Sequence, residues 1–431
     1  MFESRLQVSR RRSLAALAGL GASWGMTPAL AQMRIDIAGV GGTRLPVAIV
    51  DFRDQSSASQ PIAAIIRADL ERSGAFRSVD APAGLSETSS PVYTDWRARQ
   101  ADALVAGSVT RLADGRLDIR FKLWDVVKGA EIIGQSQAVL PDDARLAAHR
   151  IADVIYEKLT GERGVFATRM AYVTKSGSRY SLVVADADGE GARVALSSPD
   201  PIISPAWSPN GRELAYVSFE SRKATVRVQD VQTGQRRVLA DFKGTNSAPT
   251  WSPDGSHLVL SLSRDGGTQL FMINRDGSGV RRIARSSAID TEACYAPDGT
   301  RIYFVSDRGG GPQIYRMPVA GGSAERVTFG GGYNISPAIS PDGKTLAYIT
   351  RQNGAFRLSV LDLATGQSQQ ISDARDDESP SFAPNGRLIV YASRAGGKEV
   401  LMTTTLDGKI KTPLLVTLAD VREPTWGPFG R

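Results

Sequence analysis

The sequence predicts a small N-terminal α/β domain followed by an all-β six-bladed propeller. Three observations support this fold class. A turn motif recurs about every 44 residues, each interval contains four strand-like segments, and the region before residue 162 lacks the repeat. Four strands in a repeat of about this length are typical of a propeller blade.

The repeated turn is "WSPDG" at 251–255. Its other copies are "WSPNG" at 207–211, "YAPDG" at 295–299, "ISPDG" at 339–343, "FAPNG" at 382–386 and "WGPFG" at 426–430. Pro fixes φ at the first corner, Asp or Asn can bond its own backbone, and Gly takes the positive-φ position. Six copies predict six blades, over residues 165–431.

The last copy of the turn lies at the end of the chain. "AYV" at 171–173 precedes "AYV" at 215–217 by 44 residues, yet no such turn comes before it. The segment "EPTW" at 423–426 can supply the missing inner strand. We therefore expect the propeller to close by pairing its C-terminal strand into the blade that starts the array, which leaves few exposed edges.

Residues 44–162 show the alternation of an α/β domain. Helices are predicted at 61–74, which begins with Pro and ends with Gly, and at 141–159, which has acidic residues in its first turn. Four apolar segments are predicted as strands: 45–52, 101–109, 117–126 and 131–140.

Residues 1–31 have the features of an export signal. Arg5 and the run 10–12 form a basic region, an apolar stretch starts at Leu14, and "ALA" at 29–31 is a small-residue cleavage site. We expect cleavage between Ala31 and Gln32. The segment "SRRRSL" at 9–14 resembles a twin-arginine signal, so the sequence leaves open whether export uses the Sec or the twin-arginine route. No segment of the mature chain is apolar enough to span a membrane.

Composition excludes several function classes. From residue 32 the net charge is +4 with no run of Lys or Arg, which argues against a nucleic-acid partner. The two histidines, His149 and His257, share no motif, so we predict no catalytic relay, no metal site, no cofactor and no enzyme activity. The single Cys294 occupies a position that is small in every repeat, and we expect it to be a strand residue. The series is Ala206, Thr250, Cys294, Ala338, Ser381 and Thr425.

The loops that enter the inner strands should open together at one mouth of the central channel. Many of their residues are acidic or polar: Thr245, Asn246, Asp290, Thr291, Glu292, Asn334, Asp376, Asp377, Glu378 and Glu423. Loops on a rigid scaffold commonly carry binding sites. This rim could attract a basic partner or a cation, or its charges could simply be solvated, and the sequence leaves both readings open.

Taken together, the export signal, the order of the domains, the ending "EPTWGPFG" and the segment "MRIDIAGVG" at 33–41 resemble the TolB family of the periplasmic Tol–Pal system. The resemblance covers essentially the whole mature chain. It implies a non-enzymatic, monomeric periplasmic scaffold that links the inner-membrane Tol proteins to the lipoprotein Pal. In that role it would support outer-membrane integrity and constriction during cell division.

The resemblance also implies two contact regions. The N-terminal strand at 32–43 would bind TolA through Met33, Arg34, Ile35, Asp36 and Ile37, and its alternation could suit addition to a partner sheet; it could instead pack on its own domain. The loop "GTNSAPTW" at 244–251 and the segment "DTEACY" at 290–295 resemble the Pal-contacting loops. They would place Thr245, Asn246, Ala248, Asp290, Thr291 and Glu292 on the Pal-binding face.

The alternative from another class is a propeller-based periplasmic enzyme, either a glycan lyase or a hydrolase-like protein. The hydrolase needs a catalytic domain for which this chain has no length. The lyase needs clustered metal-binding histidines, and two separated histidines do not provide them.

Overall fold

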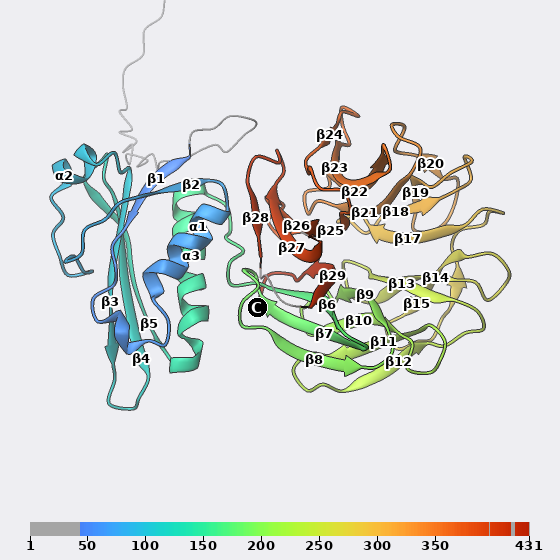
Figure 1. Ribbon diagram of the computed structural model, residues 1–431, viewed down its shortest axis with the longest axis horizontal. Coiled ribbons are helices and arrows are strands. Elements are labelled where there is room, and N and C mark those ends of the chain that lie inside the picture. The colour runs from blue at the N-terminus through green and yellow to red at the C-terminus, as the bar shows by residue number, and fades with distance from the viewer. Residues whose placement is uncertain (1–43, 396, 415–418, 431) are drawn as a thin grey trace, which may run out of the picture. The chain divides into compact units, whose positions relative to one another are not determined.

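The computed structural model of the 431-residue chain describes residues 44–395, 397–414 and 419–430 (Figure 1). The predictions for the export signal at 1–31, the cleavage site at Ala31 and Gln32, and the strand at 32–43 with Met33–Ile37 lie outside the described residues. None of the described helices is long and apolar enough to cross a membrane.

The first described part is a mixed sheet in the order β2-β1-β3-β4-β5, with helices packed on it. β1 pairs in parallel with β2 and β3, whereas β3, β4 and β5 are antiparallel. The strands are β1 (Leu45–Ile49), β2 (Phe76–Val79), β3 (Ala103–Arg111), β4 (Leu117–Asp125) and β5 (Ala130–Val139). The helices are α1 (Ile62–Arg72), α2 (Tyr93–Ala98) and α3 (Ala144–Thr160), with 3-10 turns η1 (Gln55–Ser57) and η2 (Pro141–Asp143).

Both predicted helices and all four predicted strands of this region are present. The sequence analysis missed β2 and α2, which have four and six residues. Segments of that length are too short to establish a periodic pattern. Helices α1 and α3 pack against each other, and α2 instead joins a hydrophobic cluster through Trp96, with Leu104 and Trp124 of the sheet.

Six four-stranded antiparallel sheets follow, which confirms the predicted six-bladed propeller (Figure 1). The first complete blade in the chain is β9 (Ile202–Trp207), β10 (Glu213–Ser218), β11 (Thr225–Asp230) and β12 (Arg236–Ala240). The next is β13 (Asn246–Trp251), β14 (His257–Leu262), β15 (Gln269–Asn274) and β16 (Arg281–Arg282). The third is β17 (Asp290–Tyr295), β18 (Arg301–Ser306), β19 (Gln313–Pro318) and β20 (Glu325–Arg326).

Two more blades complete the consecutive series. They are β21 (Asn334–Ile339), β22 (Thr345–Gln352), β23 (Ala355–Asp362) and β24 (Ser368–Gln370), and then β25 (Glu378–Phe382), β26 (Leu388–Ala395), β27 (Lys398–Thr405) and β28 (Lys411–Pro413). The closing blade combines both ends of the array. It consists of β29 (Asp420–Trp426), β6 (Arg169–Ser176), β7 (Arg179–Asp186) and β8 (Arg193–Ser198).

The closing blade forms as predicted, with the C-terminal strand β29 beside β6 (Figure 1). Thr425 pairs with Ala171, and Trp426 pairs with Met170. Each pair of neighbouring blades shares a hydrophobic cluster, and the closing blade is no exception, since Trp426 and Tyr172 pack with Val390 of β26. The hydrophobic contacts between blades therefore continue across the closing blade, where the two ends of the propeller meet.

The repeated turns also form a ring. A Cβ placed on Gly255 would lie 3.6 Å from Cδ of Pro209, and the glycines of the next three turns, Gly299, Gly343 and Gly386, sit in the same way against the proline of the preceding turn. A Cβ on Gly211 would lie 3.4 Å from Cγ of Pro428, the proline of the last turn. The final "WGPFG" thus completes the ring of turns, which explains why the motif recurs at the end of the chain.

Candidate functional site

The inner strands share a backbone feature that the sequence analysis did not predict. Each contains a register shift, and at that shift one residue has a φ of 46–53°. These residues are Ser204, Ala248, Glu292, Ser336, Ser379 and Glu423. A positive φ is costly for residues with a Cβ, and such bulges redirect side chains at the rims of closed sheets. The inner strands contact one another in succession, so the six bulges form a ring.

Two glutamates of this ring reach the next blade. Oε2 of Glu292 accepts a hydrogen bond from the backbone N–H of Ser336 at 2.8 Å. Oε2 of Glu423 accepts one from the backbone N–H of Ser204, across the junction between the last blade and the first. Each glutamate therefore satisfies a backbone donor that the neighbouring bulge exposes.

The ring carries an unusual electrostatic environment. Burial is the main cause that raises the pKa of Glu423, to about 7; its bond to Ser204 opposes this, and the charges of Glu378 and Glu292 add to it. Burial likewise raises the pKa values of Glu292 and of Glu378. Nearby carboxylates that share a low-dielectric site resist ionising together. This part of the channel can therefore take up protons or accept a cationic group.

In four blades a buried polar residue at the start of the inner strand, or just before it, holds the entering loop: Asn246, Asp290, Asn334 and Asp377. Nδ2 of Asn246 donates to the carbonyls of Phe242 and Ala224 at 2.9 and 3.1 Å. Oδ1 of Asp290 accepts from Arg308 at 2.8 Å and Oδ2 from Ser286 at 2.7 Å.

The predicted contact residues therefore separate into two groups. Asn246 and Asp290 have no exposed surface and use their polar atoms within the protein, so the structure corrects their assignment as surface contacts. Thr245 is exposed, while Ala248, Thr291 and Glu292 are partly exposed. The sequence analysis could not separate the groups, because a polar residue in a loop can face either solvent or the backbone.

A pocket lies near the mouth between the last two consecutive blades. Its lining is rich in carboxylates and also has apolar walls: Ile335, Phe356, Asp376, Asp377, Glu378, Ala392, Ser393, Arg394 and Glu399. Glu399 is paired with Arg422 at 2.7 Å. The predicted acidic rim is thus a structural feature, although part of its charge is neutralised internally.

The residues considered for chemistry do not assemble into a catalytic site. His149 is buried in α3, whereas His257 lies at the start of β14, so the two histidines belong to different domains. Cys294 lies in the inner strand β17, and burial raises the pKa of its thiol to about 12. A thiol with that pKa is a poor nucleophile at neutral pH.

Comparison with known families agrees with both halves of the fold. The model of the TolB amino-terminal domain matches residues 33–132, and that of the TolB β-propeller domain matches residues 156–430. A crystal structure of TolB from Acinetobacter baumannii superimposes with a TM-score of 0.84 at 37% identity, covering 92% of this chain and all of that one.

Curated relatives match at higher identity. The Tol-Pal system protein TolB of Albidiferax ferrireducens is 63% identical, covering 94% of this chain and 96% of the relative. That of a Polaromonas species is 60% identical, covering 98% of this chain and 99% of the relative. These names describe a component of the Tol–Pal system, in agreement with the prediction that the chain is not an enzyme. The chain belongs to the TolB family.

Proposed function

We propose that this protein is a periplasmic scaffold of the Tol–Pal system that links the inner-membrane Tol proteins to the lipoprotein Pal. The observation that carries the proposal is family membership over nearly the full chain. In this role the protein supports outer-membrane integrity and constriction during cell division. It acts in the periplasm as a monomer, after cleavage between Ala31 and Gln32.

The Pal-binding surface is the mouth of the propeller formed by Thr245, Ala248, Thr291 and Glu292. Three features support this choice. The first two residues come from one blade and the other two from the next, all four have exposed surface, and buried Asn246 and Asp290 hold the loops that present them. A surface whose backbone is fixed in this way loses little conformational entropy on binding. The N-terminal segment 32–43 is proposed to bind TolA.

The proposal is tested by calorimetry of the chain from Gln32 against the soluble domain of Pal from the same organism. We expect saturable binding with a Kd of about 1 μM or tighter, which corresponds to about 8 kcal/mol. Thr291→Trp should weaken binding because the larger side chain would hold the partner away from the mouth.

The matched control is Thr300→Trp. Thr300 lies in the same blade, exposed, at the turn on the opposite end of the inner strand. Equal effects of the two substitutions would reject the mouth as the binding surface. No binding up to about 100 μM, near 5.5 kcal/mol, would reject Pal as the partner.

A further inference from the structure

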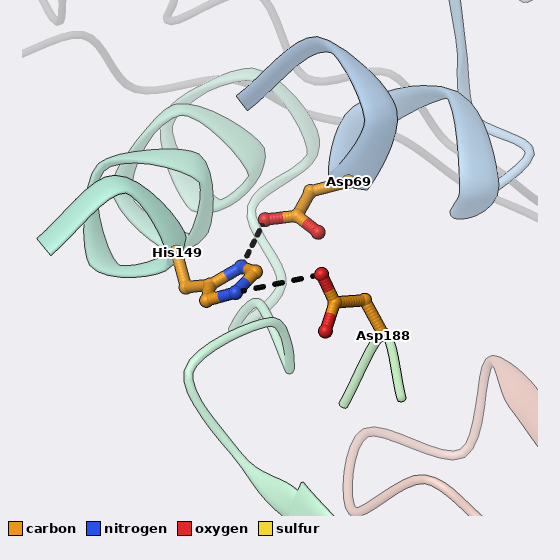
Figure 2. A group of neighbouring side chains, drawn as sticks. All are labelled: Asp69, His149 and Asp188. Carbon is orange, nitrogen blue, oxygen red and sulfur yellow. Dashed lines mark hydrogen bonds and ion pairs between the residues drawn. The ribbon is translucent and has the colours of Figure 1, made fainter. Parts of the chain in front are cut away.

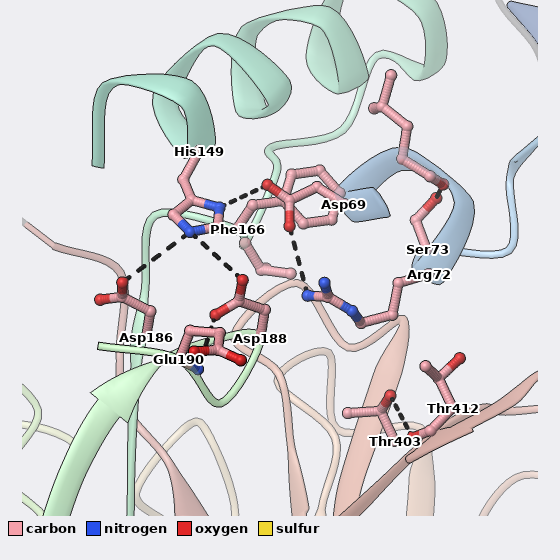
Figure 3. A network of polar contacts seen from close by, with 12 residues as sticks. Asp69, Arg72, Ser73, His149, Phe166, Asp186, Asp188, Glu190, Thr403 and Thr412 are labelled. Atoms are coloured by element: carbon pink, nitrogen blue, oxygen red, sulfur yellow. Dashed lines mark hydrogen bonds and ion pairs between the residues drawn. The ribbon is translucent and has the colours of Figure 1, made fainter. Parts of the chain in front are cut away.

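His149 is a buried imidazole at the contact between the α/β domain and the closing blade. Its side chain has no exposed surface. Nδ1 lies 2.5 Å from Oδ2 of Asp69 on α1. On its other side, Nε2 lies 3.7 Å from Oδ2 of Asp188, in the turn that follows β7 (Figure 2). It lies 4.0 Å from Oδ2 of Asp186, the last residue of β7 (Figure 3). The imidazole therefore lies between carboxylates of the two domains.

Charged groups from both domains surround the imidazole. Arg145, one turn earlier on α3, pairs with Asp188 and lies 3.3 Å from Asp186. Arg72 on α1 lies 3.4 Å from Asp69. A further carboxylate, that of Asp153 on α3, is close enough to interact with the charges of Asp69 and His149.

The charge of this cluster favours a protonated imidazole. The carboxylates of Asp69, Asp186 and Asp188 outnumber the two guanidinium groups, and Asp153 lies near them. An imidazolium therefore reduces an excess of negative charge, whereas a neutral imidazole leaves that excess in a buried place. Nε2 also has no hydrogen-bond partner among the described residues. If Nε2 carried no proton, its lone pair would face two carboxylate oxygens, which is unfavourable. If Nε2 carries a proton, its N–H faces two hydrogen-bond acceptors, which is favourable.

The balance of effects on His149 points the same way. Burial lowers the pKa of the imidazole, but the hydrogen bond and charge of Asp69 and the charge of Asp188 outweigh it, so that its pKa is raised above 6.5. Asp153 accepts hydrogen bonds from the backbone N–H groups of Phe166 and Ala167, and burial raises its pKa to about 6.

A metal ion is the competing occupant of this site. Ligand atoms of Asp69, His149 and Asp188 lie within 4.8 Å of one another, and a carboxylate bonded to the second ring nitrogen of a histidine is a common arrangement behind a zinc ligand. The guanidinium groups argue against it, because Arg145 pairs with Asp188 and Arg72 lies 3.4 Å from Asp69, so both carboxylates that a cation would use already face a positive charge. The proton is therefore the better match to the charges present.

We propose that protonated His149 is a latch that couples the α/β domain to the closing blade, and that this coupling weakens as the pH rises and the imidazole loses its proton. The inference concerns contacts within the chain and does not depend on the identity of any partner. It gives the protein a pH-sensitive joint between its two domains. The joint lies on the blade that contains both ends of the propeller.

The protonation state is tested by NMR of the full mature chain labelled with 15N-histidine. The chain has two histidines, so the signals of His149 are those lost in His149→Gln. We expect Nδ1 and Nε2 both to carry protons at pH 6, and a titration midpoint above 6.5. A neutral imidazole at pH 6 would overturn the proposal. A shift of the Nε2 signal on adding one equivalent of Zn²⁺ at pH 7 would replace it with a metal site.

The coupling is tested with Asp188→Asn and a matched control, Asp276→Asn. Both aspartates occupy the same turn position and accept the backbone N–H two residues later, but Asp276 lies in another blade, away from His149. The distance between the domains is measured with spin labels attached to cysteines in the variants Thr94→Cys and Ser221→Cys, both at exposed positions. The native cysteine is removed by Cys294→Ser so that it is not labelled.

We expect a narrow distance distribution at pH 6 that broadens by pH 8.5 in the parent chain and in Asp276→Asn. In Asp188→Asn the distribution should be broad at both pH values. Distributions that do not change with pH in the parent chain, or that change equally in the two variants, would overturn the latch.

Discussion

The indole N–H of Trp426 donates a hydrogen bond to Oγ1 of Thr168 at 2.8 Å, joining residues 258 positions apart. Trp426 is the last residue of β29, and β29 pairs with β6. Thr168 immediately precedes β6. Trp251 makes a comparable bond between neighbouring blades, to the carbonyl of Ala206 at 3.2 Å. The Trp426 bond therefore lies at the junction within the closing blade, where it fastens the C-terminal strand, whereas the Trp251 bond joins two neighbouring blades.

The first prediction concerns this junction. Trp426→Phe should lower the free energy of unfolding by about 1–2 kcal/mol, because it removes a buried hydrogen bond while keeping most of the aromatic surface. Denaturant unfolding followed by circular dichroism measures the change. Trp207→Phe is the control, since Nε1 of Trp207 occupies the equivalent position and has no hydrogen-bond partner among the described residues. Equal losses in the two variants would show that the Thr168 bond contributes nothing.

The second prediction concerns Glu423, whose pKa is raised to about 7. Because the folded state holds this proton more tightly than the unfolded chain, its contribution to stability is full below about pH 4.5 and declines as the pH rises to about 7. Glu423→Gln should remove this dependence. The variant should gain about 1–3 kcal/mol relative to the parent chain between pH 4.5 and 8.

The measurement is the free energy of unfolding at several pH values in that range. Glu325→Gln serves as a control, because Glu325 is exposed on the outer strand β20. If the parent chain and Glu423→Gln show parallel pH profiles, the carboxyl group titrates in the folded state as it does in the unfolded one.

The third prediction concerns Cys294, whose pKa is raised to about 12 by burial. At pH 8 the thiolate fraction should be roughly 10⁻⁴, so alkylation by iodoacetamide should be far slower in the native protein than in urea. Mass spectrometry after timed quenching gives both rates. Comparable rates under the two conditions would mean that the inner strand β17 leaves the thiol accessible and ionisable.

The fourth prediction separates the loop-holding residue from its exposed neighbour. Asn246→Ala should cost about 1–3 kcal/mol of stability, because it leaves the carbonyl of Phe242 and the backbone N–H of the same residue without their partner. Thr245→Ala should change stability by less than about 0.5 kcal/mol, since its side chain is exposed. Thermal unfolding of the two variants side by side makes the comparison. A larger loss for Thr245→Ala would contradict the division of the mouth residues.

The repeat architecture could be predicted from the sequence because its cause is local. Each turn needs Pro and Gly at fixed places, and the φ of 68–72° at the glycines of the first five turns is the conformation that the motif predicts: Gly211, Gly255, Gly299, Gly343 and Gly386. The strands that follow the turns are equally local, since β10, β14, β18, β22 and β26 each begin two residues after the glycine of a turn. Even the closure could be predicted, because counting the copies shows that one inner strand is missing.

The candidate site was predictable only in part. The sequence places Thr245 and Asn246 in one loop, but it contains no signal that one is exposed and the other is buried. The positive φ at Ser204 and Glu423 is equally hidden, since neither residue type favours it. The bulges exist because six strands must bend around one axis, a constraint that acts on the whole ring.

By itself, the sequence determined the number of blades, the order of the domains and the way in which the ring closes, because turn chemistry and strand periodicity act between near neighbours. Only the tertiary structure decided that His149 lies between Asp69 and Asp188, and that Glu423 bonds to Ser204. Those environments are created by segments that are distant in the chain. The charge and burial that fix their protonation arise only when these segments meet.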